Sequence, residues 1–439
     1  MNRLLITGTN SGGGKTTVTC AVLSAFKARG IVPMTFKCGP DYIDPMFHRA
    51  VSGVKSYNLD PFFLDGKGLR SHLAAHAGEL SVIEGAMGYY DGIAATEEAS
   101  AYTVARETKT PAVLVVSAQG VGATLAAIIE GLTRHRQDSC MMGVVFNDAK
   151  ISRYPDLEKI AARAGIKFYG TMPRNEEWTF PSRHLGLLAA AEIADLQDKL
   201  RSLGRQAEQT IDIDGLLALA KTAVPLKGEQ QTQCAACARL AVARDEAFCF
   251  LYEENLELLQ ALGCELVFFS PLKDSELPAN INGLYLCGGY PELHAKMLSN
   301  NKTMLQSIQQ AVESNLPTVA ESGGFLYLHE TLDGLPMCGV IPGRAYKTDQ
   351  LRRFGYIELT AVRDNLLCQA GASIRSHEFH YWDSSCPGDG FTAKKAGRSE
   401  SYLCIHATDT LFAGFPQLYF PANLEFAKQF VRRMKEYSS

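Results

Sequence analysis

The sequence predicts an α/β protein of two successive domains, the first a P-loop-type doubly wound parallel sheet and the second a further α/β domain. Three observations lead to this prediction. Short apolar segments alternate with segments of helical periodicity in both halves of the chain. A glycine-rich stretch follows the first apolar segment. The alternation stops over residues 222–238 and then resumes.

Five apolar segments of the first domain, residues 1–221, are typical of buried strands. They are RLLITGT, VPMTFKCG, LSVIEGAMG, AVLVVSAQG and GVVFND, which start at residues 3, 32, 80, 112 and 143. Each is followed by turn residues and then by helical periodicity, as in TVTCAVLSAFKARG after the glycine-rich stretch. Apolar strands separated by helices form parallel sheets that are covered on both faces, so we expect a doubly wound sheet.

The linker and the second domain follow from the same pattern. Residues 222–238 contain the polar, aperiodic stretch AVPLKGEQQTQCAACA, which predicts a linker. The second domain, residues 239–439, has strand-like segments RLAVARD, CELVFFSPL, INGLYLCGG and LPTVAESGG. Helices are expected over residues 254–263 and 300–314.

Composition restricts the classes of function. The 439 residues carry a net charge of −4 with a pI near 6.2, which argues against a dedicated binder of nucleic acid or of membrane surfaces. No apolar run is long enough to cross a bilayer, and the first residues run directly into a strand and leave no room for a signal peptide. We therefore expect a cytoplasmic protein.

The twelve cysteines lie mostly in apolar segments, as buried thiols of a cytosolic protein do. Cys234 and Cys237 form a CxxC pair. Such a pair is half of a zinc site or a redox pair, but zinc needs four ligands, and neither a second CxxC nor paired histidines lie near it in sequence. Cysteines of a solvent-facing linker are the favoured interpretation.

The stretch ITGTNSGGGKTT, residues 6–17, predicts a phosphate-binding loop between a strand and a helix. Five residues separate Gly8 from Gly14, one more than in the usual P-loop. The glycines let backbone N–H groups turn toward an anion, Lys15 can reach terminal phosphates, and Thr16 can ligate Mg²⁺. A glycine-rich turn with an incidental lysine is the less favoured alternative. The expected ATP-binding residues are Gly12, Gly13, Gly14, Lys15, Thr16 and Thr17.

Three polar clusters offer carboxylates to such a site: FKCGPDYIDPMFH (36–48), SYNLDP (56–61) and VIEGAMGYYDG (82–92). Carboxylates at the carboxyl ends of parallel strands beside a phosphate loop are suitably placed to hold Mg²⁺. Taken singly, each acidic residue is as readily a turn residue. Taken together they favour a functional site. Its candidate members are Lys37, Asp41, Asp44, Asn58, Asp60, Glu84 and Asp91.

In the second domain, VAESGGFLYL (319–328) passes from an apolar strand into a helix through small residues. A corner of this kind presents a nucleophile at the edge of a sheet, with backbone N–H groups beside it for an oxyanion. Ser322 occupies the corner. It is either a nucleophile or the position of a lost one.

These stretches, in this order, resemble the cobyrinic acid a,c-diamide synthases, a family whose ATP-binding half is similar to dethiobiotin synthetase. The likeness covers nearly the whole chain. It also includes RHLGL (183–187), RLAVARDEAFCFLYEENLELL, ELVFFSPLKD, LYLCGGYPELHA, PGRA, FGYIEL and HEFHYW. The resemblance implies that MgATP phosphorylates a tetrapyrrole carboxylate and that ammonia displaces the phosphate to give a carboxamide. It implies a second domain similar to class I glutamine amidotransferases.

The resemblance also implies roles for individual residues. The catalytic residues would be Lys15, Asp44, Glu84 and Asp91. The metal ligands would be Thr16 and Glu84. The tetrapyrrole needs cations and polar groups opposite its carboxylates. Its candidate contacts are Asp41, Tyr42, His48, Asp60, Arg344, Arg352 and Tyr356.

Both members of the amidotransferase dyad are replaced in this chain. Relatives have Cys where this chain has Ser322, and a base His where it has Gln417. Serine is a much weaker nucleophile without an adjacent base, and glutamine cannot accept a proton. Two losses favour natural divergence over a single engineered change. We therefore expect no glutaminase activity and interpret Ser322, Gln417 and the oxyanion residue Gly289 as a vestigial site.

Two further features affect this interpretation. His377 and His380 of SHEFHYW are unfavoured substitutes for the missing base, because the family has a similar segment in addition to its base. HEFH is not a zinc motif, since HExxH spaces its histidines four residues apart. Ser117 stands where relatives usually have Asp, which weakens the prediction of nucleotide recognition there.

Two classes of function stay open. The first is an ATP-dependent carbon–nitrogen ligase that amidates side-chain carboxylates of a tetrapyrrole with ammonia or another amine. The second is a non-catalytic subunit that binds a tetrapyrrole or nucleotide. The phosphate loop together with the carboxylates favours the enzyme, because a binder does not need the whole set. Cobyrinic acid and sirohydrochlorin-type acids are both open as substrates, and so is a homodimer.

Overall fold

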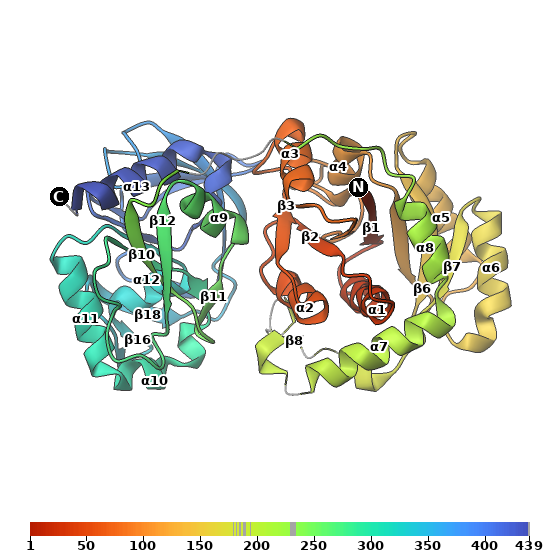
Figure 1. Cartoon of the computed structure of the whole chain (residues 1–439), viewed down its shortest axis with the longest axis horizontal. Helices are drawn as coiled ribbons and strands as arrows, with labels where there is room; N and C mark the ends of the chain where they lie inside the picture. Colours follow the sequence, from red (N-terminus) through yellow and green to blue (C-terminus); the bar gives the residue numbers. More distant parts are fainter. Residues whose placement is uncertain are drawn as a thin grey trace. The chain divides into compact units, whose positions relative to one another are not determined.

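The computed structural model describes residues 1–228 and 234–437, apart from residues 179, 181, 184, 185, 188, 189 and 194. The RHLGL stretch therefore lies partly outside the described residues. The chain divides into two compact units, Met1–Gln230 and Gln231–Ser439 (Figure 1). This division falls within residues 222–238, where the sequence predicts a linker.

The first unit contains a seven-stranded sheet in which every pairing is parallel. In spatial order the strands are β3 (Ser56–Leu59), β2 (Met34–Cys38), β4 (Leu80–Glu84), β1 (Asn2–Gly8), β5 (Ala112–Ser117), β6 (Met141–Asn147) and β7 (Lys167–Thr171). Neighbouring parallel strands end at the same edge, and Glu84 lies beside Ile6 in the register of β4 and β1. The ends of β1 and β4 therefore place the glycine-rich loop and Glu84 together.

Helices cover both faces of this sheet (Figure 1). One face packs on α1 (Lys15–Ala28), α2 (Ile43–Ser52), α7 (Leu196–Thr210) and α8 (Ile213–Ala220). The other packs on α3 (Gly66–His76), α4 (Ala101–Thr108), α5 (Thr124–Arg134) and α6 (Tyr154–Arg163). Leu4 and Ile6 point to the first face and Leu5 to the second, which explains why the strands are apolar throughout. The predicted doubly wound parallel sheet is confirmed.

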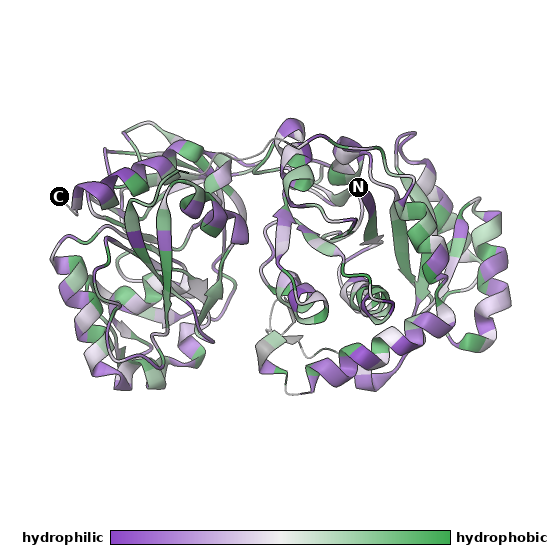
Figure 2. Cartoon of the chain, viewed as in Figure 1, coloured by the Kyte–Doolittle hydropathy of each residue, from purple (hydrophilic) through white to green (hydrophobic). Residues whose placement is uncertain are grey.

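Helix α7 shows how a polar sequence still contributes to the core. Figure 2 shows hydrophilic residues along much of its length. Its buried residues recur at helical spacing, as Leu196, Leu200, Leu203 and Ala207, and they join the core that includes α1. A Cβ on Gly204 would lie 2.7 Å from Cβ of Ser24, so glycine permits the close approach of the two helices.

Strands β3 and β7 were not predicted from the sequence. Each lies at an edge of the sheet. The four residues of β3 include a serine and an asparagine, and β7 contains a glycine, so neither has the apolar composition of a central strand. Pairing with β2 and β6 specifies them instead.

The second unit is built on a six-stranded sheet. In spatial order its strands are β12 (Cys264–Phe269), β10 (Ala238–Ala243), β13 (Gly283–Leu286), β15 (Thr318–Glu321), β25 (Leu411–Gly414) and β24 (His406–Ala407). All pairings are parallel except that of β24 with β25. The helices predicted over 254–263 and 300–314 correspond to α9 (Glu253–Ala261) and α11 (Lys302–Glu313).

Two further sheets, mostly antiparallel, were not predicted. The first comprises β17 (Leu335–Pro336), β16 (His329–Leu332), β18 (Ile341–Lys347) and β21 (Trp382–Ser384). The second comprises β23 (Ser401–Cys404), β22 (Phe391–Lys395), β19 (Arg353–Ala361), β20 (Ser373–His380) and β26 (Gln417–Leu418). Polar and charged residues are frequent in these strands, as in SIRSHEFH of β20, so they lack the continuous apolar runs of the parallel sheets.

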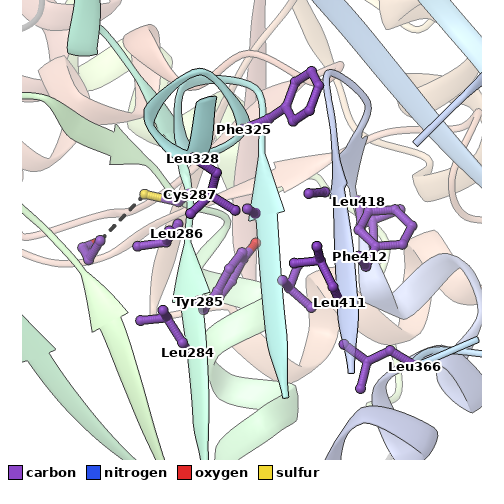
Figure 3. Close-up of a cluster of buried hydrophobic side chains, with 14 of the residues drawn as sticks. Leu284, Tyr285, Leu286, Cys287, Phe325, Leu328, Leu366, Leu411, Phe412 and Leu418 are labelled. Atoms are coloured by element: carbon purple, nitrogen blue, oxygen red, sulfur yellow. Dashed lines mark hydrogen bonds between the residues drawn. The ribbon is translucent and has the colours of Figure 1, made fainter. Parts of the chain in front are cut away.

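The core of the second unit lies where β13 and β25 meet α12 (Gly323–Leu328). Figure 3 shows Leu284, Leu286 and Phe412 on the strands, with Phe325 and Leu328 on the helix. The same picture shows Cys287, whose Sγ lies 3.4 Å from the Ala243 carbonyl oxygen. The remaining helices include α10 (Ala295–Asn300) and α13 (Leu424–Tyr437), and a short pair joins β11 (Phe248–Phe250) to β14 (Gly288–Gly289).

The segment after α8 is held to the first unit by Arg3. This side chain is fully buried, and its Nη2 donates to the carbonyl oxygens of Thr108 and Val224, each at 2.6 Å. Nε donates to the Thr110 hydroxyl at 2.9 Å. Burial lowers the pKa of Arg3 to about 10.

None of the twelve cysteines, all of which lie in the described part of the chain, forms a disulfide. Cys234 is exposed, and Cys237 Sγ lies 3.3 Å from the Gly263 carbonyl oxygen. Within the described ranges, no group of three or more His, Cys, Asp or Glu side chains could hold a metal ion. No helix there has the length and apolarity to span a membrane.

Candidate functional site

The glycine-rich loop connects β1 to α1 and has the conformation that its sequence predicts. Gly12 and Gly14 adopt φ of 76° and 89°, in the left-handed region that favours glycine. A Cβ on Gly8 would lie 2.9 Å from Lys15 Cγ, so the absent side chain leaves room for the lysine stem. The Lys15 ammonium donates to the Asn10 carbonyl oxygen at 2.7 Å.

Asn147, at the end of β6, packs against this loop. Its Nδ2 donates weakly to the Gly13 carbonyl oxygen at 3.4 Å, and a Cβ on Gly14 would lie only 2.0 Å from the same nitrogen. Sequence reasoning missed this residue, although it recognised the strand that ends there. Its position at the end of a strand could have identified it, because β5 and β6 also end at the edge where ligands bind in doubly wound sheets.

Thr16 is the centre of a group of polar side chains from three elements. Its hydroxyl donates to Glu84 Oε1 at 2.8 Å and lies 3.3 Å from Asp44 Oδ1. Lys37 Nζ lies 2.6 Å from Asp44 Oδ2 and 3.2 Å from Glu84 Oε1. Carboxylates from the end of β4 and from α2 thus converge on the first turn of α1.

Burial and neighbouring charges have opposite effects on the pKa values of several of these side chains. Burial raises the pKa of Glu84, but Lys37 and hydrogen bonds from His48 and Thr16 outweigh it and hold the pKa well below its usual range. Burial lowers the pKa of Lys37, but the carboxylates of Asp44 and Glu84 outweigh burial and raise the pKa strongly. Burial raises the pKa of Asp44, against the effect of Lys37. For Lys15, burial and the neighbouring Lys37 lower the pKa to about 8.

His48 contacts the other oxygen of Glu84. The side chain is fully buried, Nε2 lies 2.7 Å from Glu84 Oε2, and Nδ1 lies 3.3 Å from the Ser56 hydroxyl. Both ring nitrogens are therefore engaged within the protein. This does not fit the expectation that His48 contacts a substrate.

The other predicted substrate residues of the first unit border the group. Asp41 Oδ1 accepts the backbone N–H of Ile43 at 2.7 Å at the start of α2, and Asp60 Oδ1 accepts that of Phe62 at 2.8 Å. Tyr42 and Asp60 are buried. Asn58 donates to the carbonyl oxygens of Gly39 and Asp41, both at 2.8 Å. Asn58 and one oxygen each of Asp41 and Asp60 thus maintain the loops after β2 and β3.

Asp91 closes the loop that follows Glu84. Its Oδ2 accepts the Gly88 N–H at 2.8 Å, and the Tyr89 N–H donates to the Gly8 carbonyl oxygen at 2.9 Å. The loop after β4 is thereby joined to the start of the glycine-rich loop. Asp91 itself is exposed beside these backbone contacts.

These residues fit a magnesium ion bound together with phosphate. The hydroxyl of Thr16 and the carboxylates of Asp44 and Glu84 are hard oxygen donors, which Mg²⁺ prefers. Mg²⁺ in such sites uses one or two carboxylates and completes its shell with phosphate and water. A cation among these carboxylates would also favour their ionised forms.

In the second unit, Ser322 lies at a sharp corner between β15 and α12. Its φ and ψ are 48° and −105°, a strained conformation for a residue with a side chain. Its N–H donates to the Gly414 carbonyl oxygen at 2.8 Å. A Cβ on Gly324 would lie 2.1 Å from the Leu286 carbonyl oxygen, so glycine permits the tight corner.

Gly289 and Gln417 lie near this corner. A Cβ on Gly323 would be 3.0 Å from the Gly289 nitrogen, and one on Gly288 would be 2.6 Å from Gln417 Nε2. Glu321, just before the corner, accepts the Leu418 N–H and the Tyr285 hydroxyl, both at 3.0 Å. Burial raises the pKa of Glu321 to about 8, against those two hydrogen bonds.

The two histidines of SHEFHYW have other partners. His377 pairs with Gln417 across β20 and β26, and its Nδ1 lies 3.4 Å from the Tyr252 hydroxyl. Burial lowers the pKa of His377 to about 3. The ring of His380 stacks on Phe415 at 3.8 Å. Within the described residues, no hydrogen bond connects either histidine to Ser322.

Arg344, Arg352 and Tyr356, expected to contact a tetrapyrrole, all lie in the second unit. Arg352 Nε is 2.5 Å from Asp383 Oδ2, and the Arg344 guanidinium lies 5.6 Å from the centre of the Tyr346 ring. Their contact with a substrate stays a prediction.

The fold and site define a P-loop nucleotide-binding unit followed by an α/β unit with the elbow of an amidotransferase. Residues 4–187 match the CobQ/CobB/MinD/ParA nucleotide binding domain, and residues 239–399 match the CobB/CobQ-like glutamine amidotransferase domain. Both parts of the predicted fold class are thus confirmed.

Curated relatives match almost the whole chain. Cobyrinate a,c-diamide synthase of Clostridium acetobutylicum is 38% identical over 98% of this chain and 100% of its own length. The corresponding protein of Caldanaerobacter subterraneus is 36% identical over 99% and 98%. Among solved structures, the MinD cell division protein of Aquifex aeolicus covers 52% of this chain and 100% of its own, with a TM-score of 0.30 and 12% identity. The chain belongs to the cobyrinate a,c-diamide synthase family.

Proposed function

We propose that this chain is an ATP-dependent carbon–nitrogen ligase that amidates side-chain carboxylates of cobyrinate. The observation that supports it most directly is the convergence of Thr16, Asp44 and Glu84 beside the glycine-rich loop. Curated relatives that match over nearly the full chain are cobyrinate a,c-diamide synthases. A binding protein without chemistry would not require Lys15 and two buried carboxylates in the same place.

The proposed reaction has two steps. A carboxylate is a poor electrophile, so one of its oxygens first bonds to the terminal phosphorus of ATP while the bond to ADP breaks. Ammonia then attacks the carbonyl carbon of the acyl phosphate and loses a proton, and phosphate leaves with the electrons of the C–O bond. The product is a carboxamide.

The chain's residues would bind and orient the phosphates. Lys15 would place its cation near the terminal phosphate, where negative charge develops. Thr16, Glu84 and Asp44 would hold Mg²⁺, which neutralises phosphate charge when bound. Asp91 would keep the loop after β4 in place beside the reacting groups. Asp41, Tyr42 and Asp60 are the proposed substrate contacts of the first unit.

We propose ammonia or another amine, and not glutamine, as the nitrogen donor. The elbow at Ser322 retains its corner, and the Gly289 nitrogen lies near it. Neither a thiol nor a base is present there, because Ser322 and Gln417 occupy the two positions. The second unit would then serve substrate binding or structural support.

Mass spectrometry of the reaction tests the proposal. Cobyrinic acid with MgATP and ammonium should give the carboxamide product with the unmodified protein and none with Lys15→Ala. Lys27→Ala, in the last turn of α1, is the matched control and should behave as the unmodified protein. Absence of amide from cobyrinic acid would overturn the assignment of substrate. Spectral changes on tetrapyrrole binding without turnover would favour a binding subunit.

A further inference from the structure

His48 is a polar side chain of the phosphate site to which the proposed reaction gives no role. It projects from α2, is fully buried, and places Nε2 2.7 Å from Glu84 Oε2. The other oxygen of the same carboxylate, Oε1, accepts from Thr16 at 2.8 Å and lies 3.2 Å from Lys37 Nζ. The Glu84 carboxylate is therefore held at both oxygens.

The geometry fixes the proton on His48. An ionised carboxylate can only accept, so Nε2 must carry the hydrogen of the contact with Glu84. At 2.7 Å this is a short, charge-assisted hydrogen bond. Nδ1 faces the Ser56 hydroxyl at 3.3 Å, which keeps the ring in one orientation.

We infer that His48 is a positioning residue, which holds the Glu84 carboxylate so that Oε1 stays beside Thr16 and available to Mg²⁺. This inference rests on the proposed function only in so far as the site binds Mg²⁺ with ATP. Histidine is suited to this position because it bridges Glu84 to a hydroxyl on β3. Without the bond, the buried Oε2 would lose this partner, and the carboxylate would be held only at Oε1.

Two other interpretations fit the structure less well. A direct substrate contact would require an accessible ring, and His48 is fully buried. The order Glu84, His48, Ser56 is that of a catalytic triad, but Ser56 is only 3% exposed, so its hydroxyl cannot reach a substrate. A core histidine without function would not need a carboxylate of the phosphate site as its partner.

The test compares two variants, His48→Gln and His48→Asn, whose amide side chains differ in length. His48→Gln can place an amide N–H where Nε2 lies, whereas the shorter His48→Asn reproduces only the position of Nδ1. The measurement is the affinity for Mn²⁺ in the presence of ATP, followed by the electron paramagnetic resonance of free Mn²⁺. We expect His48→Asn to weaken Mn²⁺ binding by about tenfold or more, and His48→Gln to recover most of the loss.

Controls separate this effect from a general loss of stability. ATP binding without metal should change less than about twofold in both variants, since His48 acts through the metal ligand. His329→Asn alters another fully buried histidine, bonded to Ser384 at 2.7 Å, and should leave Mn²⁺ affinity unchanged. In a Glu84→Gln background, His48→Asn should add little to the loss, because both changes remove the same interaction.

The outcomes are distinct. Equal Mn²⁺ affinity of the Asn and Gln variants, or full additivity with Glu84→Gln, would overturn the inference. If either of these outcomes were found and the unmodified protein still amidated cobyrinic acid, only the inference about His48 would fail, and the proposed function would stand. The expected Mn²⁺ pattern without any amidation would support the inference and overturn the function. An unmodified protein that binds no Mn²⁺ with ATP would overturn both.

Discussion

The side-chain amide of Asn147 lies against the α-carbon of Gly14, so that a Cβ at this glycine would be 2.0 Å from Asn147 Nδ2. Gly14 also has φ of 89° and directly precedes α1. Two separate physical reasons, steric contact and backbone conformation, thus require glycine at the position before Lys15. The end of β6 helps to determine the shape of the phosphate loop.

Gly14→Ala should abolish binding of MgATP and leave the fold in place. The new methyl group would collide with Asn147 and would also strain the left-handed backbone. Isothermal titration with MgATP and a thermal unfolding curve measure the two effects. Gly30→Ala is the control, because Gly30 has φ of 78° but no atom within 4 Å of its Cβ position. If Gly14→Ala binds MgATP normally, the loop is not the nucleotide site.

Lys15→Ala should reduce turnover by about 100-fold or more while the free energy of unfolding changes little. The lysine cation is expected to stabilise charge that develops on the transferred phosphoryl group. The buried stem of Lys15 lies beside Gly8, and its ammonium donates to the Asn10 carbonyl oxygen. Single-turnover rates with ammonium and denaturant unfolding check this prediction. An unchanged rate would remove Lys15 from the catalytic residues.

The unmodified protein should transfer no label from amide-labelled glutamine into product when free ammonia is scavenged. Ser322→Cys alone should not restore transfer, because a thiol without a base stays protonated near neutral pH. Adding Gln417→His supplies a base beside Gly288 and should give at least partial recovery. Label in the product of the unmodified protein would show that another residue performs the chemistry of the dyad.

The second unit should lose stability as the pH falls below about 6.5. Burial lowers the pKa of His377 to about 3 from 6.5, so between these values the unfolded chain binds more protons than the folded one. At pH 5 this removes about 2 kcal/mol of the stability present at pH 7.5, at 1.36 kcal/mol per pH unit. His377→Asn should reduce that pH-dependent loss by the same amount.

Urea unfolding at pH 7.5 and pH 5.0 measures this difference. A Trp178→Phe background leaves Trp382 as the tryptophan reporter in the second unit. His329, whose pKa burial lowers to about 4, should keep part of the pH dependence in the variant. An identical loss of stability in the His377→Asn variant and its parent would show that His377 is not the group responsible.

The predicted site depended on local signals. The phosphate loop, Asp44 and Glu84 were predicted because glycine spacing and acidic residues after apolar strands are visible in a short window. Asn147 and the partnership of His48 with Glu84 were not, because they join segments that lie far apart in the chain. The sequence shows which residue type stands at each position, but the hydrogen-bond partner of that residue depends on which strands become neighbours in the fold.

The sequence by itself determined the parallel sheet of the first unit, because strands buried on both faces leave continuous apolar runs. The sequence also led to the prediction that Ser322 and Gln417 replace the amidotransferase dyad, and this stays a prediction. Only the tertiary structure decided where β3 and β7 pair, how the additional sheets of the second unit form, and that His48 faces Glu84. Edge strands and antiparallel sheets are specified by contacts between distant segments, and a buried side chain takes its role from the neighbours that folding supplies.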